Sequence, residues 1–201
     1  MRKALLIVAG AVVGLSFGGG EQAVSTFTDK RDGKVYRIVQ IGRQVWFAEN
    51  LNYAAKGSKC YENSPDSCAK YGRLYDWNTA MTACPAGTHL STAEEWTALV
   101  DYAGGEKKAG KKLKSTSGWN EDGNGTDDYG FLALPGGGGN SRGRFDNDGY
   151  LGYWWNATEY NANFACYLDI SYVVGQVRMY YDGYKTFLFS VRCVADKEGE
   201  Q

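Results

Sequence analysis

The chain has 201 residues, of which 27 are glycine and 15 are tyrosine, and its 22 basic and 23 acidic side chains give a formal net charge of −1. Acidic and basic residues are interspersed, so the sequence indicates neither a basic patch for nucleic acid nor a long acidic arm. The length is enough for a single well-filled core.

The first residues predict export from the cell. A basic start, MRK, precedes an apolar run of about fourteen residues, ALLIVAGAVVGLSF, which is too short to cross a bilayer comfortably. This pattern, with small residues after the run, is typical of a secretory signal peptide, which we place at residues 1–20 with a short leader at 21–25. No cysteine follows the run, which argues against a lipoprotein anchor, and a retained membrane anchor is the alternative. We therefore expect a secreted or cell-surface protein.

Five cysteines predict disulfide bonds, because an exported chain meets an oxidising environment. Cys60 and Cys68 bracket a loop rich in turn-forming residues, and a bridge between them would stabilise the fold by about 2–3 kcal/mol. A bridge from Cys84 to Cys193 would close most of the domain and contribute about 4–5 kcal/mol. One cysteine must then stay free. A zinc site is not indicated, since the chain has no C-x-x-C pair and a single histidine, His89.

The first half of the chain carries a strand pattern and then a helix pattern. The β-rich runs KVYRIVQI and QVWFAENL, joined by Gly42-Arg43, predict a β-hairpin within residues 26–51. Residues 72–84 carry apolar side chains at spacings of three and four, which predicts an amphipathic helix that Pro85 ends. Those side chains are Leu74, Trp77, Met81 and Cys84.

A second helix is predicted from Ser91. Ser91 and Glu94 have the spacing of a capping box, in which the serine side chain caps the Glu94 amide and Glu94 reaches back to the serine amide. Gly104-Gly105 ends the helix. Its apolar stripe consists of Trp96, Leu99, Val100 and Ala103.

Residues 115–152 predict little regular structure, because glycine, asparagine and aspartate are frequent and GGGG occupies 136–139. The oxygen-rich segments GWNEDGNGTDDYG and RFDNDGY resemble calcium loops in composition, but the EF-hand spacing with its final glutamate is missing. We therefore favour ordinary Asx-type turns and expect no cofactor, with calcium as the alternative.

From residue 164 onwards, apolar and polar side chains alternate. The runs 164–171, 176–181 and 187–193 predict a three-stranded antiparallel meander with one face in the core and one towards solvent. With helices before it and neither βαβ alternation nor an internal repeat, the class is α+β. Just before the meander, Trp154 and Trp155 would face opposite sides of a strand, and we favour a scaffold role for both, one in the core and one over the glycine-rich loop.

The region between Tyr150 and Tyr184 holds eight of the 15 tyrosines, mixed with Asn, Asp, Ser and Gly. This composition resembles an antibody paratope, in which tyrosine gives a large contact area at low entropic cost and small polar residues adapt their hydrogen bonds. We predict that the outward face of the meander and its flanking loops bind a ligand. The candidate ligand-binding residues are Tyr160, Asn161, Asn163, Tyr167, Asp169, Ser171, Arg178, Tyr180 and Tyr184.

Seven motifs occur in the order IGRQVWFAENLNY, YGRLYDWNTAM, CPAGTHLSTAEEW, LKSTSGW, YGFLALPGG, YWWNATEYN and FSVRCV. Together they closely resemble the Fibrobacter succinogenes major paralogous domain, from about Thr26 to Val194. The resemblance implies a C-type lectin-like or formylglycine-generating-enzyme-like fold, with two helices packed on small twisted antiparallel sheets and long glycine-rich loops. The domain would cover residues 26–195, followed by a disordered tail at 196–201.

The resemblance also bears on the cysteines. Cys60 with Cys68, and Cys84 with Cys193, lie in recurrent motifs of the family, whereas Cys166 does not. Cys166 is therefore the candidate for a buried free thiol, with a bridge from Cys166 to Cys193 as the alternative. Formylglycine-generating relatives use a pair of nearby cysteines, and here Cys193 is expected in a disulfide, so the pattern departs where that chemistry would occur.

The resemblance further implies surface or secreted proteins, and in C-type lectin-like proteins this tyrosine-rich region is the ligand face. We therefore expect a non-catalytic recognition module for an extracellular glycan or protein ligand. The alternatives are a structural or assembly protein of the bacterial cell envelope and a degenerate formylglycine-generating-like enzyme. The sequence indicates no particular oligomeric state.

Overall fold

The computed structural model describes residues 25–173 and 175–196. The predicted signal peptide, leader and C-terminal tail lie wholly or mostly outside these residues. The described part contains two mostly antiparallel β-sheets and four α-helices, which confirms the α+β class.

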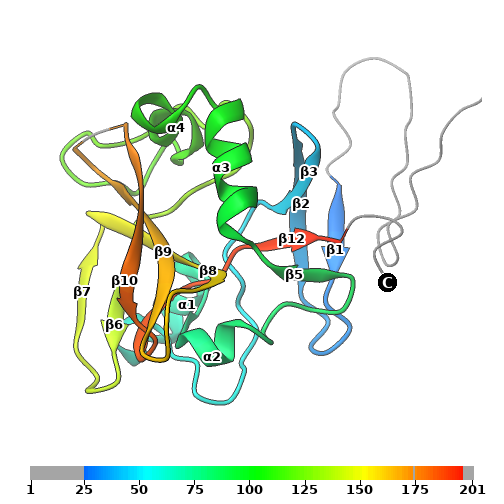
Figure 1. The fold of residues 1–201 in the computed structure, drawn as a ribbon, viewed down its shortest axis with the longest axis vertical. Coiled ribbons are helices and arrows are strands. Elements are labelled where there is room, and N and C mark those ends of the chain that lie inside the picture. Colours follow the sequence, from blue (N-terminus) through cyan, green and yellow to red (C-terminus); the bar gives the residue numbers. More distant parts are fainter. Residues whose placement is uncertain (1–24, 174, 197–201) are drawn as a thin grey trace, which may run out of the picture.

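The smaller sheet has five strands (right in Figure 1). Its order is β1 (Thr26–Thr28), β2 (Val35–Ile41), β3 (Gln44–Phe47), β12 (Cys193–Ala195) and β5 (Thr88–Leu90). β2 and β3 form the predicted hairpin, and the φ of Gly42 is 61°, a conformation that glycine adopts without strain. β12 pairs with both β3 and β5, so the sheet joins the two ends of the domain.

The larger sheet has seven strands and is branched (left in Figure 1). Its main path is β10 (Val177–Tyr184), β9 (Phe164–Ser171), β8 (Leu151–Glu159), β11 (Phe187–Ser190), β6 (Gly136–Asn140) and β7 (Phe145–Asp148), while β4 (Leu74–Tyr75) pairs with β11. β8, β9 and β10 are antiparallel neighbours. The predicted meander is wrong in its third strand: β11 lies beside β8 instead of β10, because the chain crosses back to pair with β4 and β6.

The described residues form four α-helices, two more than predicted. α3 (Ala93–Tyr102) lies between the sheets in the upper half of Figure 1, and α4 (Glu106–Leu113) contacts β10. A 3₁₀ turn, η1 (Tyr61–Asn63), leads into α1 (Pro65–Tyr71), and α2 (Trp77–Ala80) follows β4.

The helix predicted over 72–84 is mostly wrong. Leu74 belongs to β4, where it pairs with Ser190 of β11, and only the four residues of α2 are α-helical. Asp76 caps α2 by accepting a hydrogen bond from the Thr79 amide at 2.9 Å. The helical spacing of the apolar residues was therefore overridden by strand pairing with a distant part of the chain.

The second predicted helix is confirmed, but its capping box lies one residue later. The Thr92 hydroxyl accepts from the Glu95 amide at 3.1 Å, and the Glu95 carboxylate accepts from the Thr92 amide at 2.9 Å. Ser91 is buried, and its carbonyl accepts from Ala157 of β8. This bond ties Ser91 to β8, and the helix starts at the second of two overlapping capping sequences, with Thr92 as its N-cap.

The glycine-rich region forms strands that the sequence did not predict. GGGG is part of β6, where a Cβ on Gly137 would lie 2.5 Å from the Asp146 carbonyl and one on Gly138 would lie 3.0 Å from the Phe189 ring. The missing side chains therefore allow β6 to approach its neighbours closely. The long loop before β6 is held by buried Lys114, whose Nζ donates to the carbonyls of Ser171 and Tyr172.

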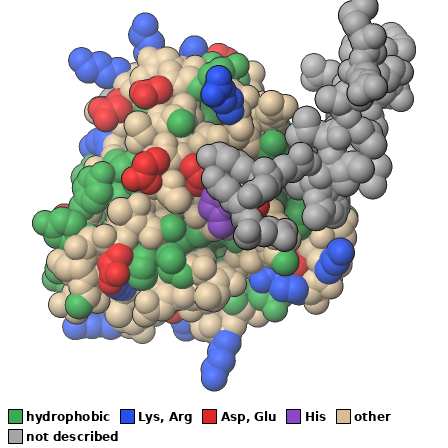
Figure 2. Space-filling model, turned by 45° about the vertical axis from the view of Figure 1, so that its right-hand side comes forward, with side chains coloured by type: hydrophobic (Ala, Val, Ile, Leu, Met, Phe, Trp, Pro, Cys, Tyr) green, Lys and Arg blue, Asp and Glu red, His purple; other side chains and the backbone are tan. Residues whose placement is uncertain are grey.

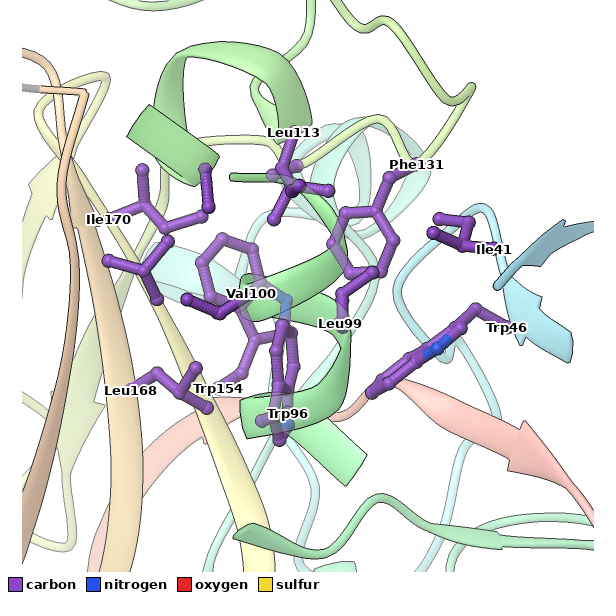
Figure 3. Packing of buried hydrophobic residues seen from close by; sticks show 14 of the residues in the cluster. Ile41, Trp46, Trp96, Leu99, Val100, Leu113, Phe131, Trp154, Leu168 and Ile170 are labelled. Carbon is purple, nitrogen blue, oxygen red and sulfur yellow. The ribbon is translucent and has the colours of Figure 1, made fainter. Parts of the chain in front are cut away.

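Trp154 and Trp155 are both fully buried, so the scaffold prediction for them is confirmed. They point to opposite sides of β8 into two separate core clusters, and the second ring does not cover the glycine-rich loop. Figure 3 shows Trp96 of α3 close to Trp154, with Trp46 of the smaller sheet on its other side. Each ring buries apolar area worth about 2–3 kcal/mol, so this tryptophan cluster joins the two sheets.

Arg192 lies fully buried between the two sheets without a carboxylate in contact among the described residues. Its guanidinium donates to Asn50 Oδ1 and to the carbonyls of Phe47, Phe131 and Leu132. Burial lowers its pKa to about 9, which leaves it charged at neutral pH. Asn50 Oδ1 also accepts from Trp154 Nε1, so one polar network connects the core of both sheets.

His89 fastens the start of α3 to the C-terminal end of the described chain. Its Nε2 lies 2.9 Å from Glu95 Oε1 and its Nδ1 lies 2.7 Å from Asp196 Oδ1. The hydrogen bond to Glu95 first, and then that to Asp196, raise the pKa of His89 from 6.5 to about 9. In Figure 2 the histidine (purple) lies at the surface, and basic side chains are spread over this face without forming one patch.

This arrangement predicts a pH-dependent stability. Because the pKa is higher in the folded state, the imidazolium stabilises the fold fully below pH 6.5, and this stabilisation is lost as pH rises to about 9. We expect the free energy of unfolding of wild type to exceed that of H89Q by about 1 kcal/mol at pH 6. The difference is small because solvent screens the His89 side chain, which is 38% exposed. Urea unfolding at pH 6 and pH 10 measures it. An equal difference at both pH values would contradict the assignment.

Candidate functional site

The exposed candidate ligand-binding residues lie at one end of the larger sheet. Tyr160 and Tyr184 have 63% and 52% of their surface exposed, and Asn161 and Asn163 are exposed beside them. Tyr160, Asn161 and Asn163 lie in the loop between β8 and β9, and Tyr184 directly precedes the turn between β10 and β11. The amide of Lys185 donates to the Asn163 carbonyl at 3.0 Å, which holds the loop against the turn.

Asp169 and Ser171, predicted to face outward, are buried instead. Arg178 on β10 donates to both carboxylate oxygens of Asp169, from Nε at 3.0 Å and from Nη2 at 3.1 Å. Burial raises the pKa of Asp169, and the hydrogen bond from Arg178 opposes this effect. The pair cross-links β9 and β10, so Asp169 is engaged by its own chain.

Tyr167 and Tyr180 are half-buried in an aromatic stack on the same face. Their ring centroids are 5.1 Å apart with nearly parallel planes, and Phe189 lies 5.0 Å from Tyr167. Tyr153 stacks on Phe189 at 4.9 Å. Burial raises the pKa of Tyr153 to about 12 and that of Tyr167 well above its ordinary value, so both phenols are protonated at neutral pH. Because these rings pack against one another, the stack offers little free surface to a ligand.

Beyond this stack, two groups of exposed or half-buried rings lie around the loop and the turn. We call them the aromatic end. Tyr160 and Tyr181 have centroids 6.3 Å apart, and Tyr184 lies 4.5 Å from Phe164 and 5.4 Å from Phe187. The aromatic end thus consists of Tyr160, Phe164, Tyr181, Tyr184 and Phe187.

A polar groove of about 370 Å³ opens next to the aromatic end, and we call it the lysine groove. Its volume is at the lower end of the range for small-molecule sites. Four segments meet there: the loop before η1, the start of α2, the turn between β6 and β7, and the turn after β10. The polar side chains that line it are Lys59, Asp76, Asn78, Ser141, Lys185 and Thr186.

The sequence pattern missed half of this site for identifiable reasons. By alternation from Val177 and Met179, Tyr181 would face the core, but a bulge between Tyr180 and Gly183 breaks the register, and Tyr181 is exposed. Lys59 and Asn78 are far from the tyrosine-rich segment in sequence, and only the fold brings them to it. A glycine at 183 inside the strand was the one available indication of a bulge.

The cysteines pair as the family resemblance implied. Disulfides join Cys60 to Cys68 and Cys84 to Cys193, and Cys166 is free and buried. Asn156 Nδ2 lies 2.9 Å from the Cys166 sulfur, and burial raises the pKa of the thiol to about 11. A buried thiol in this state is not a thiolate at neutral pH.

Neither a metal cluster nor a membrane-spanning helix is present in the described ranges. No group of three or more His, Cys, Asp or Glu residues within 25–173 and 175–196 has an arrangement that could hold a metal ion. In the same ranges no helix is both long enough and apolar enough to cross a membrane. In the segment GWNEDGNGTDDYG, whose composition resembles a calcium loop, Asp127 Oδ1 accepts a hydrogen bond from the Leu132 amide at 2.8 Å.

Fold and site together define a disulfide-braced α+β domain in which loops at one end of a sheet present aromatic rings beside a polar groove. Residues 39–195 match the Fibrobacter succinogenes major domain, Fib_succ_major, and the chain belongs to this family. This confirms the family resemblance seen in the motifs. No curated protein and no solved structure matches the chain.

Proposed function

We propose that the chain is an exported, non-catalytic recognition module with a C-type lectin-like architecture, which binds an extracellular glycan through the aromatic end. The observation that carries this proposal is two groups of rings at one end of the larger sheet, Tyr160 with Tyr181 and Tyr184 with Phe164 and Phe187, beside a polar groove. Aromatic rings offer flat apolar faces on which sugar rings stack, and neighbouring amides and hydroxyls fix their orientation.

The chemistry of the cysteines supports binding over thiol catalysis. A thiol enzyme needs an accessible thiolate with a basic partner. Cys166 is buried, and its partner Asn156 is an amide. His89 belongs to the smaller sheet, where it hydrogen-bonds Glu95 and Asp196 and so holds the start of α3 in place.

The proposal predicts that the triple variant Y160A/Y181A/Y184A loses binding to washed bacterial or plant cell walls and to a glycan array. We expect a loss of about 150-fold or more, because three aromatic hot spots contribute at least about 1 kcal/mol each. The rings are exposed, so the melting temperature should change little. Tyr102, which is 57% exposed on α3, provides the matched control Y102A. If the triple variant binds as tightly as wild type, the aromatic end is not the ligand site.

A further inference from the structure

We propose that the lysine groove binds the carboxylate of an acidic sugar, so that the glycan recognised by the module carries uronic acid residues. This inference rests on the proposed function and names its ligand class. The two lysines of the groove, Lys59 and Lys185, come from segments far apart in sequence and are brought to one cleft by the fold. Cationic groups that converge on a small polar cleft favour an anion.

Lys59 is the cation available to a ligand. Its backbone is fixed by two hydrogen bonds to Leu74, at 2.9 Å and 2.8 Å, and it directly precedes the Cys60–Cys68 disulfide. Its side chain is half-buried, and no carboxylate within 25–173 and 175–196 pairs with it. A fixed backbone reduces the entropy lost when the ammonium orders on a ligand.

Lys185 adds a second, more buried cation. Only 11% of its side chain is exposed, and its ammonium lies 4.5 Å from the centroid of the Trp77 ring. It pairs with Glu159, whose side chain is 55% exposed at the surface of the loop. This contact ion pair offsets the charge of Lys185, so the cation of the groove that has no carboxylate partner among the described residues is Lys59.

The one carboxylate that lines the groove is engaged elsewhere. Asp76 accepts from the amide and from the hydroxyl of Thr79, at 2.9 Å and 3.0 Å, and so caps α2. Its oxygens are therefore directed to the helix, while Asn78, Ser141 and Thr186 add neutral hydrogen-bonding groups to the groove. Neutral donors and acceptors around a cation suit the hydroxyls and carboxylate of a uronic acid.

The groove and the aromatic end share the turn between β10 and β11. Lys185 and Thr186 line the groove, and the flanking residues Tyr184 and Phe187 belong to the aromatic end. A sugar chain that stacks on these rings therefore reaches the groove with its next residue. This shared turn favours a glycan over an acidic peptide as the occupant.

The test compares oligogalacturonate with the same oligomer after full methyl esterification, which removes the charge and keeps the sugar chain. By titration calorimetry at low salt, wild type should bind the acid at least about tenfold more tightly than the ester, the value of one charge-assisted hydrogen bond. K59Q should lose most of this preference. K107Q, which changes an exposed lysine on α4, should keep it.

Each other outcome has a defined meaning. Equal binding of acid and ester, or an unchanged preference in K59Q, overturns the inference. If K59Q still binds cell walls while the tyrosine triple variant does not, the proposed function stands and only the acidic-sugar assignment fails. Tighter, Lys59-dependent binding of poly-glutamate than of oligogalacturonate would overturn it in favour of an acidic protein partner.

Discussion

Replacing Arg192 by methionine is expected to lower the free energy of unfolding by about 3–5 kcal/mol. Methionine fills a similar space but leaves the carbonyls of Phe47, Phe131 and Leu132 without the donors that now satisfy them. The total free energy of unfolding of such a domain is about 5–15 kcal/mol, so the variant should lose a large part of its stability. Urea unfolding followed by tryptophan fluorescence measures the change.

Arg37 supplies the matched control. It forms an ion pair with Glu49 at 3.1 Å, and the side chains are 44% and 41% exposed, so R37M should change stability by less than about 1 kcal/mol. R192K should fall near R192M, because an ammonium lacks the planar fork that reaches four acceptors. If R192M unfolds at the same urea concentration as R37M, the buried network does not hold the sheets together.

The position of Arg192 in the chain explains why this network matters for the site. β11 belongs to the larger sheet and β12 to the smaller one, and Arg192 lies between them. Asn50, which receives two of its hydrogen bonds, follows β3 in the smaller sheet and also accepts from Trp154 in the larger one. The orientation of the larger sheet, and with it the aromatic end, therefore depends on a buried charge.

Features with a local cause could be predicted from the sequence. The Gly42 turn, the apolar stripe on α3 and the exposed loop residues around Tyr160 follow from neighbouring residues alone. The capping box was displaced by one residue because Ser91-Thr92 and Glu94-Glu95 offer two overlapping versions of it. A tertiary hydrogen bond from Ala157 decided between them.

Features with a distant cause could not be predicted. Leu74 lies in a strand only because Ser190 pairs with it, and β6 exists because its glycines let Phe189 and Asp146 approach. Asp169 alternates correctly, but Arg178 and the tyrosine stack cover it. The lysine groove depends on four separate segments, so no local pattern indicates it.

The double variant C84A/C193A is expected to lose about 4–5 kcal/mol of stability, which is comparable to the effect at Arg192. The bond joins residues 109 positions apart, so its removal frees most of the unfolded domain from a constraint. It also frees β12, which directly follows Arg192 and connects β3 with β5. Differential scanning calorimetry in the absence of reductant measures the loss.

The second disulfide offers an internal comparison for that experiment. Cys60 and Cys68 are only 8 positions apart, so C60A/C68A should lose about 2–3 kcal/mol, clearly less than the long-range pair. C60A/C68A should weaken ligand binding more than C84A/C193A does, because Lys59 precedes Cys60 and lines the lysine groove. The two variants thus separate stability from recognition. The Cys84–Cys193 bond mainly stabilises the domain, whereas the Cys60–Cys68 bond holds the backbone beside the lysine groove. Equal losses of stability with no difference in binding would contradict this division.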